Sequence, residues 1–415
     1  MRLYKNSILV LLLISTLDAS SLKEIIQSTL KNNENLKASV IDSRAKEKAY
    51  NSVENTHNPT LSAGISHSRL DIDTRAIQVK DTLMGSLKLG IDIYDGGKSS
   101  AIKRQKSYEY QASKLDTITT QKETILQIVT LFFQTKTAID SIEVFKEKGI
   151  TLKAQYQRMK TKYDIKMVTI DEVLKLRSEY ETNQYTIEEI KYQKEELLET
   201  LSLLSGRKIK SIDDSVLPNV KNLTLRDSEH IESLNLSLKA LDENVKIVES
   251  AKNIQVRLED SLNVYNYSDY NEKLLMDLPE TQNQLNISLT YRLFDTTTKH
   301  QIEVAKLAKL ASNERVIFAK NQEKSTFNLA KKKLITQQLK INSLKSAVEM
   351  GESVYKLVKI KYQNGTVDNI TYLDALSKRT FNKALYRQAL NNYEIAKANY
   401  YFSSGIDYKR VLKRW

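Results

Sequence analysis

The stretch LKLGIDIYDGGK, residues 87–98, changes its hydrophobic period before its end. Up to Tyr94, apolar side chains alternate with polar or small ones, which is the period of a strand with one apolar face. From Lys98 to Lys162 there is no proline and a single glycine, as in a very long helix. Gln284 to Leu293 alternates in the same way and leads into Thr298–Lys361, which again holds no proline and one glycine. The sequence therefore predicts, twice, an amphipathic strand that feeds a long helix.

The chain contains a long internal repeat. Three pairs of residues recur at offsets of 200, 199 and 199, namely Tyr94-Asp95 as Phe294-Asp295, Lys162-Tyr163 as Lys361-Tyr362, and Ser205-Gly206 as Ser404-Gly405. A repeat of this length is too long for a solenoid unit and implies two structurally equivalent halves. A shorter helix, at about 22–56 or 225–253, and a weaker strand begin each half. The expected division is a signal peptide at 1–19, a first repeat at 20–206, an equatorial linker at 207–224, a second repeat at 225–405 and a C-terminal tail at 406–415.

Each long helix is predicted to turn back on itself. Thr169 begins the sequence pattern of a capping box, and Asp368 is a strong N-cap at the equivalent position of the second half. Asn364-Gly365, just before it, tolerates the positive φ of a tight turn. Two antiparallel helical hairpins are therefore expected to turn near 163–169 and 362–368.

The N-terminal residues have the pattern of a secretory signal. An apolar run, Ile8 to Leu17, follows Arg2 and Lys5 and is too short to span a bilayer as a helix. Small residues come after it, so cleavage is expected near Ala19 or Ser20.

Composition narrows the classes of function. The chain has no cysteine, 10 glycines and 3 prolines, which argues against a disulfide scaffold, a zinc-thiolate protein and a disordered chain. The formal net charge is +13, but basic residues are interleaved with acidic ones along the chain, so we expect solvated helix surfaces and no nucleic-acid partner. A seven-residue spacing of apolar residues from Phe327 to Tyr355 predicts side-by-side, coiled-coil-like packing.

Two features imply self-association. Four strands with one apolar face cannot form an edge-free structure in lipid, because unpaired backbone groups are costly there. The long helices also have seams that one pair of hairpins cannot cover. The strands are therefore expected to close with strands from other copies of the chain.

Several motifs occur in a fixed order and are partly duplicated. They are Leu89–Lys98 before a long helix, Leu293-Phe294-Asp295 in the second half, Tyr362–Asp368, and a run from Leu373-Asp374-Ala375-Leu376 to Tyr393, Ala396, Tyr400 and Gly405. In this order and spacing they resemble the TolC-like outer-membrane efflux family, across nearly the whole chain after the signal peptide.

The resemblance implies a mixed α and β membrane protein. Three identical chains would each give four strands to one twelve-stranded β-barrel in the outer membrane of a Gram-negative bacterium. Their antiparallel hairpins would continue as a long α-helical barrel across the periplasm. The implied function is the exit duct of a tripartite efflux pump that exports small molecules. The implied partners are two further copies of the chain, a periplasmic adaptor (membrane fusion) protein, an inner-membrane transporter of the RND or ABC type, and outer-membrane lipid.

The resemblance also implies a gate at the periplasmic end, with Glu172, Tyr362, Thr371 and Asp374 as its candidate residues. Tyr362 is expected opposite Glu172, with the phenol donating to the carboxylate. Asp374 is expected to face the constriction, where three acidic copies would favour cations.

The hairpin turns are the implied points of contact with the adaptor, through Lys166, Met167, Gly365 and Thr366. Three positions depart from the best-known family pattern. Val367 stands where the best-studied members have a basic residue, Thr371 replaces the outer of two gate acids, and Lys166 replaces a turn glycine. These departures bear on the closed-state lock and on cation selectivity.

Catalysis is not expected. His57, His67, His230 and His300 are isolated, and neither a phosphate-binding glycine loop nor a nucleophile elbow occurs, so we expect no enzyme, no metal and no cofactor. Two alternatives stay open, the exit duct of a type I protein secretion system and a secreted coiled-coil structural or adaptor protein. The coiled-coil protein would share the hairpins but would not need four amphipathic strands.

Overall fold

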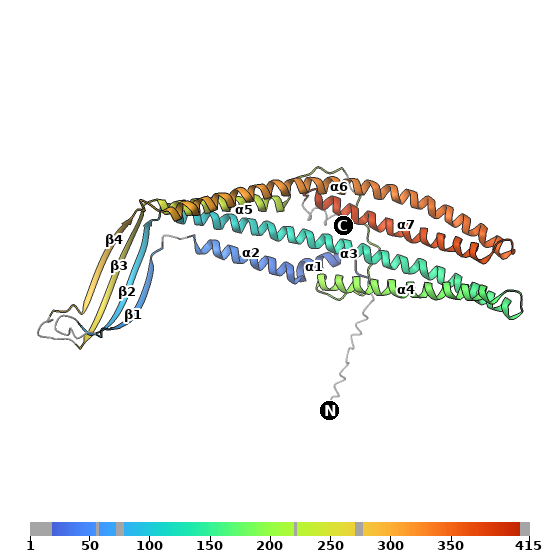
Figure 1. Ribbon diagram of the computed structural model, residues 1–415, viewed down its shortest axis with the longest axis horizontal. Helices are drawn as coiled ribbons and strands as arrows, with labels where there is room; N and C mark the ends of the chain where they lie inside the picture. Colours follow the sequence, from blue (N-terminus) through green and yellow to red (C-terminus); the bar gives the residue numbers. More distant parts are fainter. Residues whose placement is uncertain (1–18, 55–57, 72–78, 220–221, 270–276, 407–415) are drawn as a thin grey trace, which may run out of the picture. The chain divides into compact units, whose positions relative to one another are not determined.

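The computed structural model describes residues 19–54, 58–71, 79–219, 222–269 and 277–406 (Figure 1). The predicted signal peptide lies outside the described residues, apart from Ala19. The first repeat forms α1 (Leu22–Asn32), α2 (Glu34–Ser52), β1 (Thr60–Arg69), β2 (Asp81–Tyr94), α3 (Lys98–Asp164) and α4 (Ile170–Ser205). The second repeat forms α5 (Glu229–Glu249), the 3-10 turn η1 (Ser250–Lys252), β3 (Gln255–Ser268), β4 (Thr281–Thr290), α6 (Thr296–Gln363) and α7 (Asn369–Ser403).

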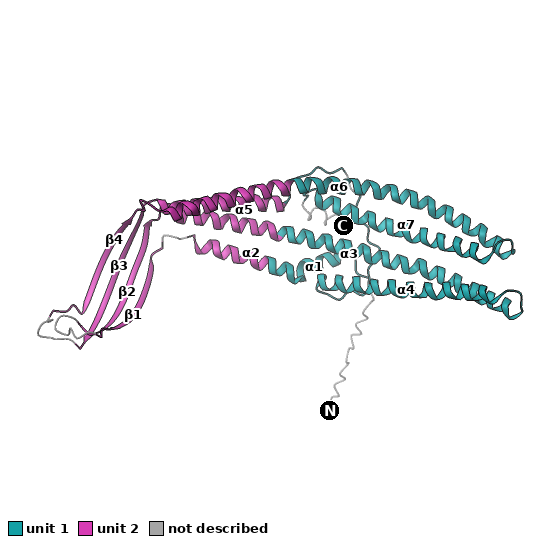
Figure 2. Cartoon of the chain, viewed as in Figure 1, with its two compact units in different colours: residues 1–39, 118–228, 321–415 teal, residues 40–117, 229–320 magenta. Residues whose placement is uncertain are grey.

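The chain divides into two compact units, which Figure 2 colours separately. Unit 1 comprises residues 1–39, 118–228 and 321–415, and unit 2 comprises residues 40–117 and 229–320. All four strands belong to unit 2, and all of α4 and α7 belong to unit 1. No helix within the described ranges combines the length and the apolar character needed to cross a membrane.

The strands form one antiparallel sheet in chain order, β1-β2-β3-β4. The register pairs Leu61 with Leu89 and Leu258 with Ile287. Since paired residues share a face, apolar side chains of all four strands lie on one side of the sheet. The opposite side carries polar residues, among them Lys88, Arg257 and Asn286. Within the described chain, β1 and β4 each pair along one edge only.

The first helical segment differs from its prediction. One helix over 22–56 is expected, but Asn33 separates α1 from α2. Its side-chain oxygen accepts a hydrogen bond from Leu36 N (2.9 Å), and its amide donates to Leu204 O (2.8 Å). The expectation of a single helix is therefore wrong, because this asparagine caps α2 and binds α4 at the same time.

Hairpin 1, α4 with the unit 1 part of α3, packs against hairpin 2, α7 with the unit 1 part of α6. One core cluster centres on Ile125, Phe132, Phe133 and Leu201, all 0% exposed, with α1 against it. A second cluster lies nearer the turns and draws on all four hairpin helices, through Leu152, Leu176, Tyr355, Tyr372 and Leu376. Apolar burial therefore joins the two hairpins along unit 1.

The single glycine of each predicted long helix marks a close contact with the return helix. In hairpin 1, Asn183 donates its amide to the carbonyl four residues before Gly149 (3.0 Å), and a Cβ on Gly149 would lie 2.9 Å from that amide nitrogen. In hairpin 2, Asn382 donates to the carbonyl four residues before Gly351 (3.1 Å), and a Cβ there would lie 3.1 Å away. The glycines leave room for these amides.

The linker between the repeats is held by α7. Lys397 is 2% exposed and donates to Leu217 O (2.8 Å), while Glu394 accepts from Leu217 N (2.8 Å). Tyr400 accepts from Leu223 N (3.1 Å). A buried ammonium group is tolerated here because a carbonyl and the Glu394 carboxylate (2.8 Å) surround it.

Candidate functional site

Both hairpins end in the same type of helix C-cap. In hairpin 1, Met167 N donates to Lys162 O (2.9 Å) and Lys166 N donates to the carbonyl three residues before it (2.8 Å). In hairpin 2, Thr366 and Gly365 make the same two bonds, at 2.9 and 3.1 Å. This pair of bonds defines a Schellman motif. The residues predicted to contact an adaptor are thus the two residues that follow the helix in each motif.

The first of these two residues needs a left-handed backbone. Gly365 has φ 73° and Lys166 has φ 60°. Glycine adopts this conformation freely, whereas for a residue with a Cβ atom the left-handed conformation costs about 1–2 kcal/mol of conformational free energy. The turn of hairpin 1 is therefore strained where that of hairpin 2 is not.

The return helices also begin differently. Asp368 accepts hydrogen bonds from Thr371 N (2.9 Å) and from the Thr371 hydroxyl (2.6 Å), so its side chain caps α7. Thr169 occupies the N-cap position of α4 but makes no side-chain bond to the backbone, so the expected capping box is not formed. The Thr169 hydroxyl instead bonds the carboxylate of Asp171 and lowers the pKa of that group.

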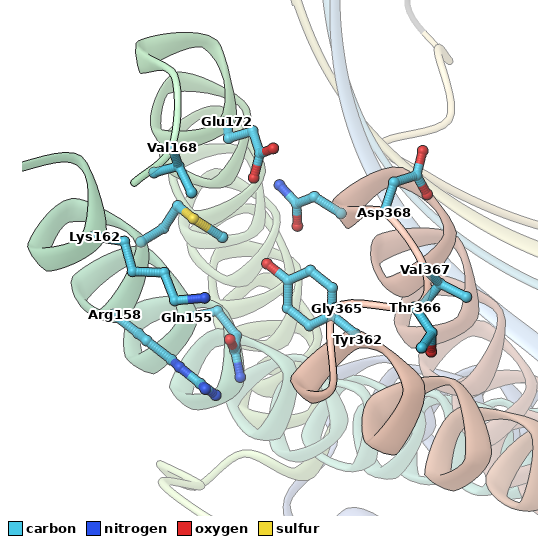
Figure 3. Close-up of a pocket in the computed structure, with 12 residues that line it drawn as sticks. Gln155, Arg158, Lys162, Val168, Glu172, Tyr362, Gly365, Thr366, Val367 and Asp368 are labelled. Carbon is cyan, nitrogen blue, oxygen red and sulfur yellow. The ribbon is translucent and has the colours of Figure 1, made fainter. Parts of the chain in front are cut away.

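A cavity of about 400 Å³ lies between the two turns (Figure 3). Hairpin 1 contributes Arg158, Lys162 and Glu172 to its wall, and hairpin 2 contributes Tyr362 and Asn369. Figure 3 shows Tyr362 reaching into this space, with Glu172 on another part of the wall. The expected hydrogen bond from the phenol to Glu172 is not made, and the hydroxyl is buried without a partner.

Stacking explains where the phenol lies. The Tyr362 ring stacks on Tyr372, with centroids 4.7 Å apart and planes inclined by 14°. Burial, and then the negative charge of Glu172, raise the pKa of Tyr362 to about 12, against the opposing charge of Arg158. The hydroxyl therefore stays protonated at neutral pH and is available as a donor.

Other polar atoms of the cavity wall are also unsatisfied. Gln155 Oε1 and both amide atoms of Asn369 are buried without a hydrogen-bond partner among the described residues. Each such group costs about 1–3 kcal/mol unless water or a ligand satisfies it. The turn region is therefore held together by stacked rings and apolar packing rather than by polar links.

The other two gate candidates do not line this cavity. Thr371 is engaged with Asp368, as described above. The carboxylate of Asp374 pairs with Lys378 one turn later (2.8 Å), and the two side chains are 58% and 72% exposed. Such an exposed pair contributes little to stability, but the lysine offsets the negative potential expected from Asp374.

Sequence reasoning did not single out Tyr372, Asn369 or Arg379. The chain has 22 tyrosines, and no local sequence pattern distinguishes Tyr372 from the others. In the structure its side chain is 0% exposed. Its importance depends on a neighbouring hairpin that is distant in sequence. Among the described residues, no group of three or more His, Asp or Glu side chains is placed to hold a metal ion.

Comparisons with known proteins relate the chain to a family and to solved structures. Residues 25–207 match the family described as outer membrane efflux protein. The outer membrane channel CmeC of Campylobacter jejuni shares the fold with a TM-score of 0.81 at 18% identity, covering 94% of this chain and 88% of that one. The outer membrane protein VceC of Vibrio cholerae does so with a TM-score of 0.79 at 14% identity, covering 92% and 96%. A comparison with curated proteins found no match.

At these identities the solved structures establish the fold. They confirm the mixed α and β class with two structural repeats. The matched family is described as an efflux protein and CmeC as an outer membrane channel, and neither description is that of an enzyme.

Proposed function

We propose that three copies of the chain form an exit duct in the outer membrane of a Gram-negative bacterium. The premise is the resemblance to the TolC-like outer-membrane efflux family, which is confirmed by the match over residues 25–207 together with the shared fold. Efflux is the activity that the family description supports. Small molecules are the proposed cargo, delivered by an inner-membrane transporter of the RND or ABC type through a periplasmic adaptor.

The observation that carries the proposal is the sheet, whose two outer strands each leave one edge unpaired among the described residues. A strand edge exposes a row of N–H and C=O groups that lipid cannot satisfy. Three four-stranded sheets would make a closed barrel of twelve strands, an even number within the range of outer-membrane barrels. The edge strand β1 of one copy would then pair with β4 of the next.

The two faces of the sheet support the same assignment. Ile65 is 84% exposed and Leu285 and Ile287 are each 66% exposed, which suits contact with lipid. The polar face, where Arg257 pairs with Asp92 (2.9 Å), would line a water-filled interior. A secreted coiled-coil structural or adaptor protein would not need a sheet with one apolar face and one polar face.

The hairpin turns are proposed as the entrance. Lys166, Met167, Gly365 and Thr366 would meet the adaptor, and the gate candidates Glu172, Tyr362, Thr371 and Asp374 lie within a few residues of them. Residues 1–19 are proposed as the leader that directs the chain out of the cytoplasm, and 20–206 and 225–405 as the two repeats joined by the linker.

A matched pair of lysine substitutions in β1 tests the proposal. Ile65→Lys puts a charge on the apolar face, where an outer-membrane barrel loses about 2–4 kcal/mol at the bilayer midplane. Ser66→Lys puts the same charge on the polar face. We expect Ile65→Lys to reduce the yield of detergent-extracted trimer strongly, and Ser66→Lys to assemble and shift ion selectivity in planar bilayers. A wild-type chain that purifies as a monomer without detergent would overturn the proposal.

A further inference from the structure

Within unit 1, α4 and α6 are the outer helices. Figure 1 shows them on opposite sides of the unit, with α3 and α7 between them. The two inner helices are joined to each other by polar bonds. Arg379 on α7 donates to Glu147 on α3 (2.5 Å), and Asn391 on α7 donates to Asp140 on α3 (2.9 Å). The outward sides of α4 and α6 therefore cannot meet within one copy of the chain.

The exposed side of α4 is acidic. It carries an apolar stripe of side chains that are each more than half exposed, namely Leu174, Tyr185, Tyr192 and Leu203. Their spacings of 11, 7 and 11 residues are close to three, two and three helical turns, so these side chains share one face. Four exposed glutamates on this face make no side-chain hydrogen bond or ion pair among the described residues, namely Glu181, Glu189, Glu196 and Glu199. In all, α4 holds nine acidic residues and four basic ones, and we call this side the acidic face of α4.

The exposed side of α6 is basic. Its apolar stripe consists of Leu339, Met350 and Leu357, which are each more than half exposed and are spaced by 11 and 7 residues. Four exposed lysines flank the stripe and form no ion pair within the part of the chain that the structure describes, namely Lys332, Lys333, Lys340 and Lys361. Residues 321–363 hold nine lysines against three acidic residues, and we call this side the basic face of α6.

The two faces complement each other in charge and in height above the turns. Glu199 lies 29 residues into α4, and Lys333 lies 30 residues before the end of α6. Glu196 and Lys340 lie 26 and 23 residues from the same two ends. At 1.5 Å per residue, the members of each pair are within about 5 Å of the same height. Two acidic faces, or two basic faces, would instead bring like charges together.

We infer that a second copy of this chain covers these faces, with the basic face of α6 in one copy against the acidic face of α4 in the next. The inference rests on the proposed function and adds the charges through which the copies recognise each other. Each copy then uses a different face on each side, and such heterologous contacts can close into a ring. The apolar stripes supply buried area, whereas the charges fix the order of the copies and disfavour contacts between like faces.

Charge reversal in the full-length protein tests the inference. Glu196→Lys with Glu199→Lys makes part of the acidic face basic, and we expect the yield of detergent-extracted trimer to fall at least fivefold. Adding Lys333→Glu and Lys340→Glu to the same chain reverses both sides of the contact, and should restore at least half of the wild-type yield. Helical content by circular dichroism shows whether each variant folds.

A control and a cross-linking measurement complete the test. Lys153→Glu with Lys160→Glu, at two exposed lysines of α3, changes as many charges away from both faces and should leave the trimer yield unchanged. A carbodiimide joins a carboxylate directly to an amine that contacts it. Mass spectrometry of the treated wild-type trimer should therefore find α4 peptides joined to α6 peptides of another copy.

The outcomes separate this inference from the proposed function. A wild-type trimer that conducts in planar bilayers, with a reversed acidic face that assembles equally well, would overturn the inference and leave the duct intact. A fourfold variant that assembles no better than the twofold one would also overturn it, as would cross-links that join α4 to α4. A wild-type chain that forms neither trimer nor channel would instead refute the proposed function.

Discussion

Hairpins 1 and 2 share the same local structure. Both end in a Schellman motif, and both place an asparagine of the return helix against the one glycine of the long helix. The asparagines are offset by 199 residues and the glycines by 202, so the contact is kept although the helices have shifted by about one turn.

Besides the differences at the turns, two differences lie where hairpin 2 packs against hairpin 1. At the offset of 199, Tyr372 of hairpin 2 corresponds to Val173 and Arg379 to Tyr180. Hairpin 2 therefore supplies both the buried ring and the charge that hold the pair together. The comparison teaches that the packing inside each hairpin is repeated in both copies, whereas the contacts between the hairpins use residues that differ between the copies.

The largest expected effect is the loss of the Tyr372 ring. Tyr372→Ala should lower local stability near the turns by about 3–5 kcal/mol, as for other large buried rings. Val173→Ala should cost only about 1–2 kcal/mol, because two methyl groups are removed. Native-state hydrogen exchange of residues 150–182 and 353–378 measures both. Tyr372→Phe is the control, since it removes only the 3.4 Å contact with the Tyr355 hydroxyl. Similar losses in the two alanine variants would contradict the asymmetry between hairpins.

Exchanging the turn residues should change stability in opposite directions. Gly365→Lys forces a side chain into a left-handed conformation and should cost about 1–2 kcal/mol. Lys166→Gly should stabilise its turn by roughly 0.5–1 kcal/mol, because relief of strain exceeds the added freedom of the unfolded chain. Exchange rates of the Met167 and Thr366 amides report the two effects. Met167→Ala, beside the strained residue, should leave both turns unchanged. A destabilised Lys166→Gly turn would refute the strain argument.

The helix caps should give the smallest difference. Asp368→Ala should fray the first turn of α7, whereas Thr169→Ala should leave α4 nearly unchanged, because only Asp368 caps the backbone. Hydrogen bonds from Thr371 lower the pKa of Asp368 below its ordinary 3.8, so its stabilisation is complete above that value and is lost as the pH falls through the lowered pKa. Asp368→Asn keeps the acceptor and should abolish this pH dependence. Carboxylate titration by NMR, with amide exchange of the first turn, checks both statements, and an unchanged pH profile in Asp368→Asn would contradict them.

Much of the fold could be predicted from local patterns. Alternation around Leu89 and Leu289 predicted strands that the structure contains, and the scarcity of breakers predicted α3 and α6. Both turns fall inside the predicted ranges. In hairpin 2 the reason is local, because Gly365 and the Asp368 cap act over a few positions. The break at Asn33 was missed because its amide binds Leu204 O, a partner distant in sequence.

The candidate site could be located but not described. Tyr362 and Glu172 were expected to meet, and the structure places both on one cavity wall without the bond between them. The ring that holds Tyr362 in place, Tyr372, belongs to the next helix, and no periodicity indicates such stacking.

The sequence by itself determined the repeat, the helix and strand periods and the chemistry of the turns, because these depend on backbone preferences and on neighbours within a few residues. Only the tertiary structure decided that Arg379 reaches Glu147, that Tyr362 stacks instead of bonding Glu172, and that Asn33 divides the first helix. Such contacts depend on how side chains from separate helices share the space between them, and a one-dimensional pattern does not specify that sharing.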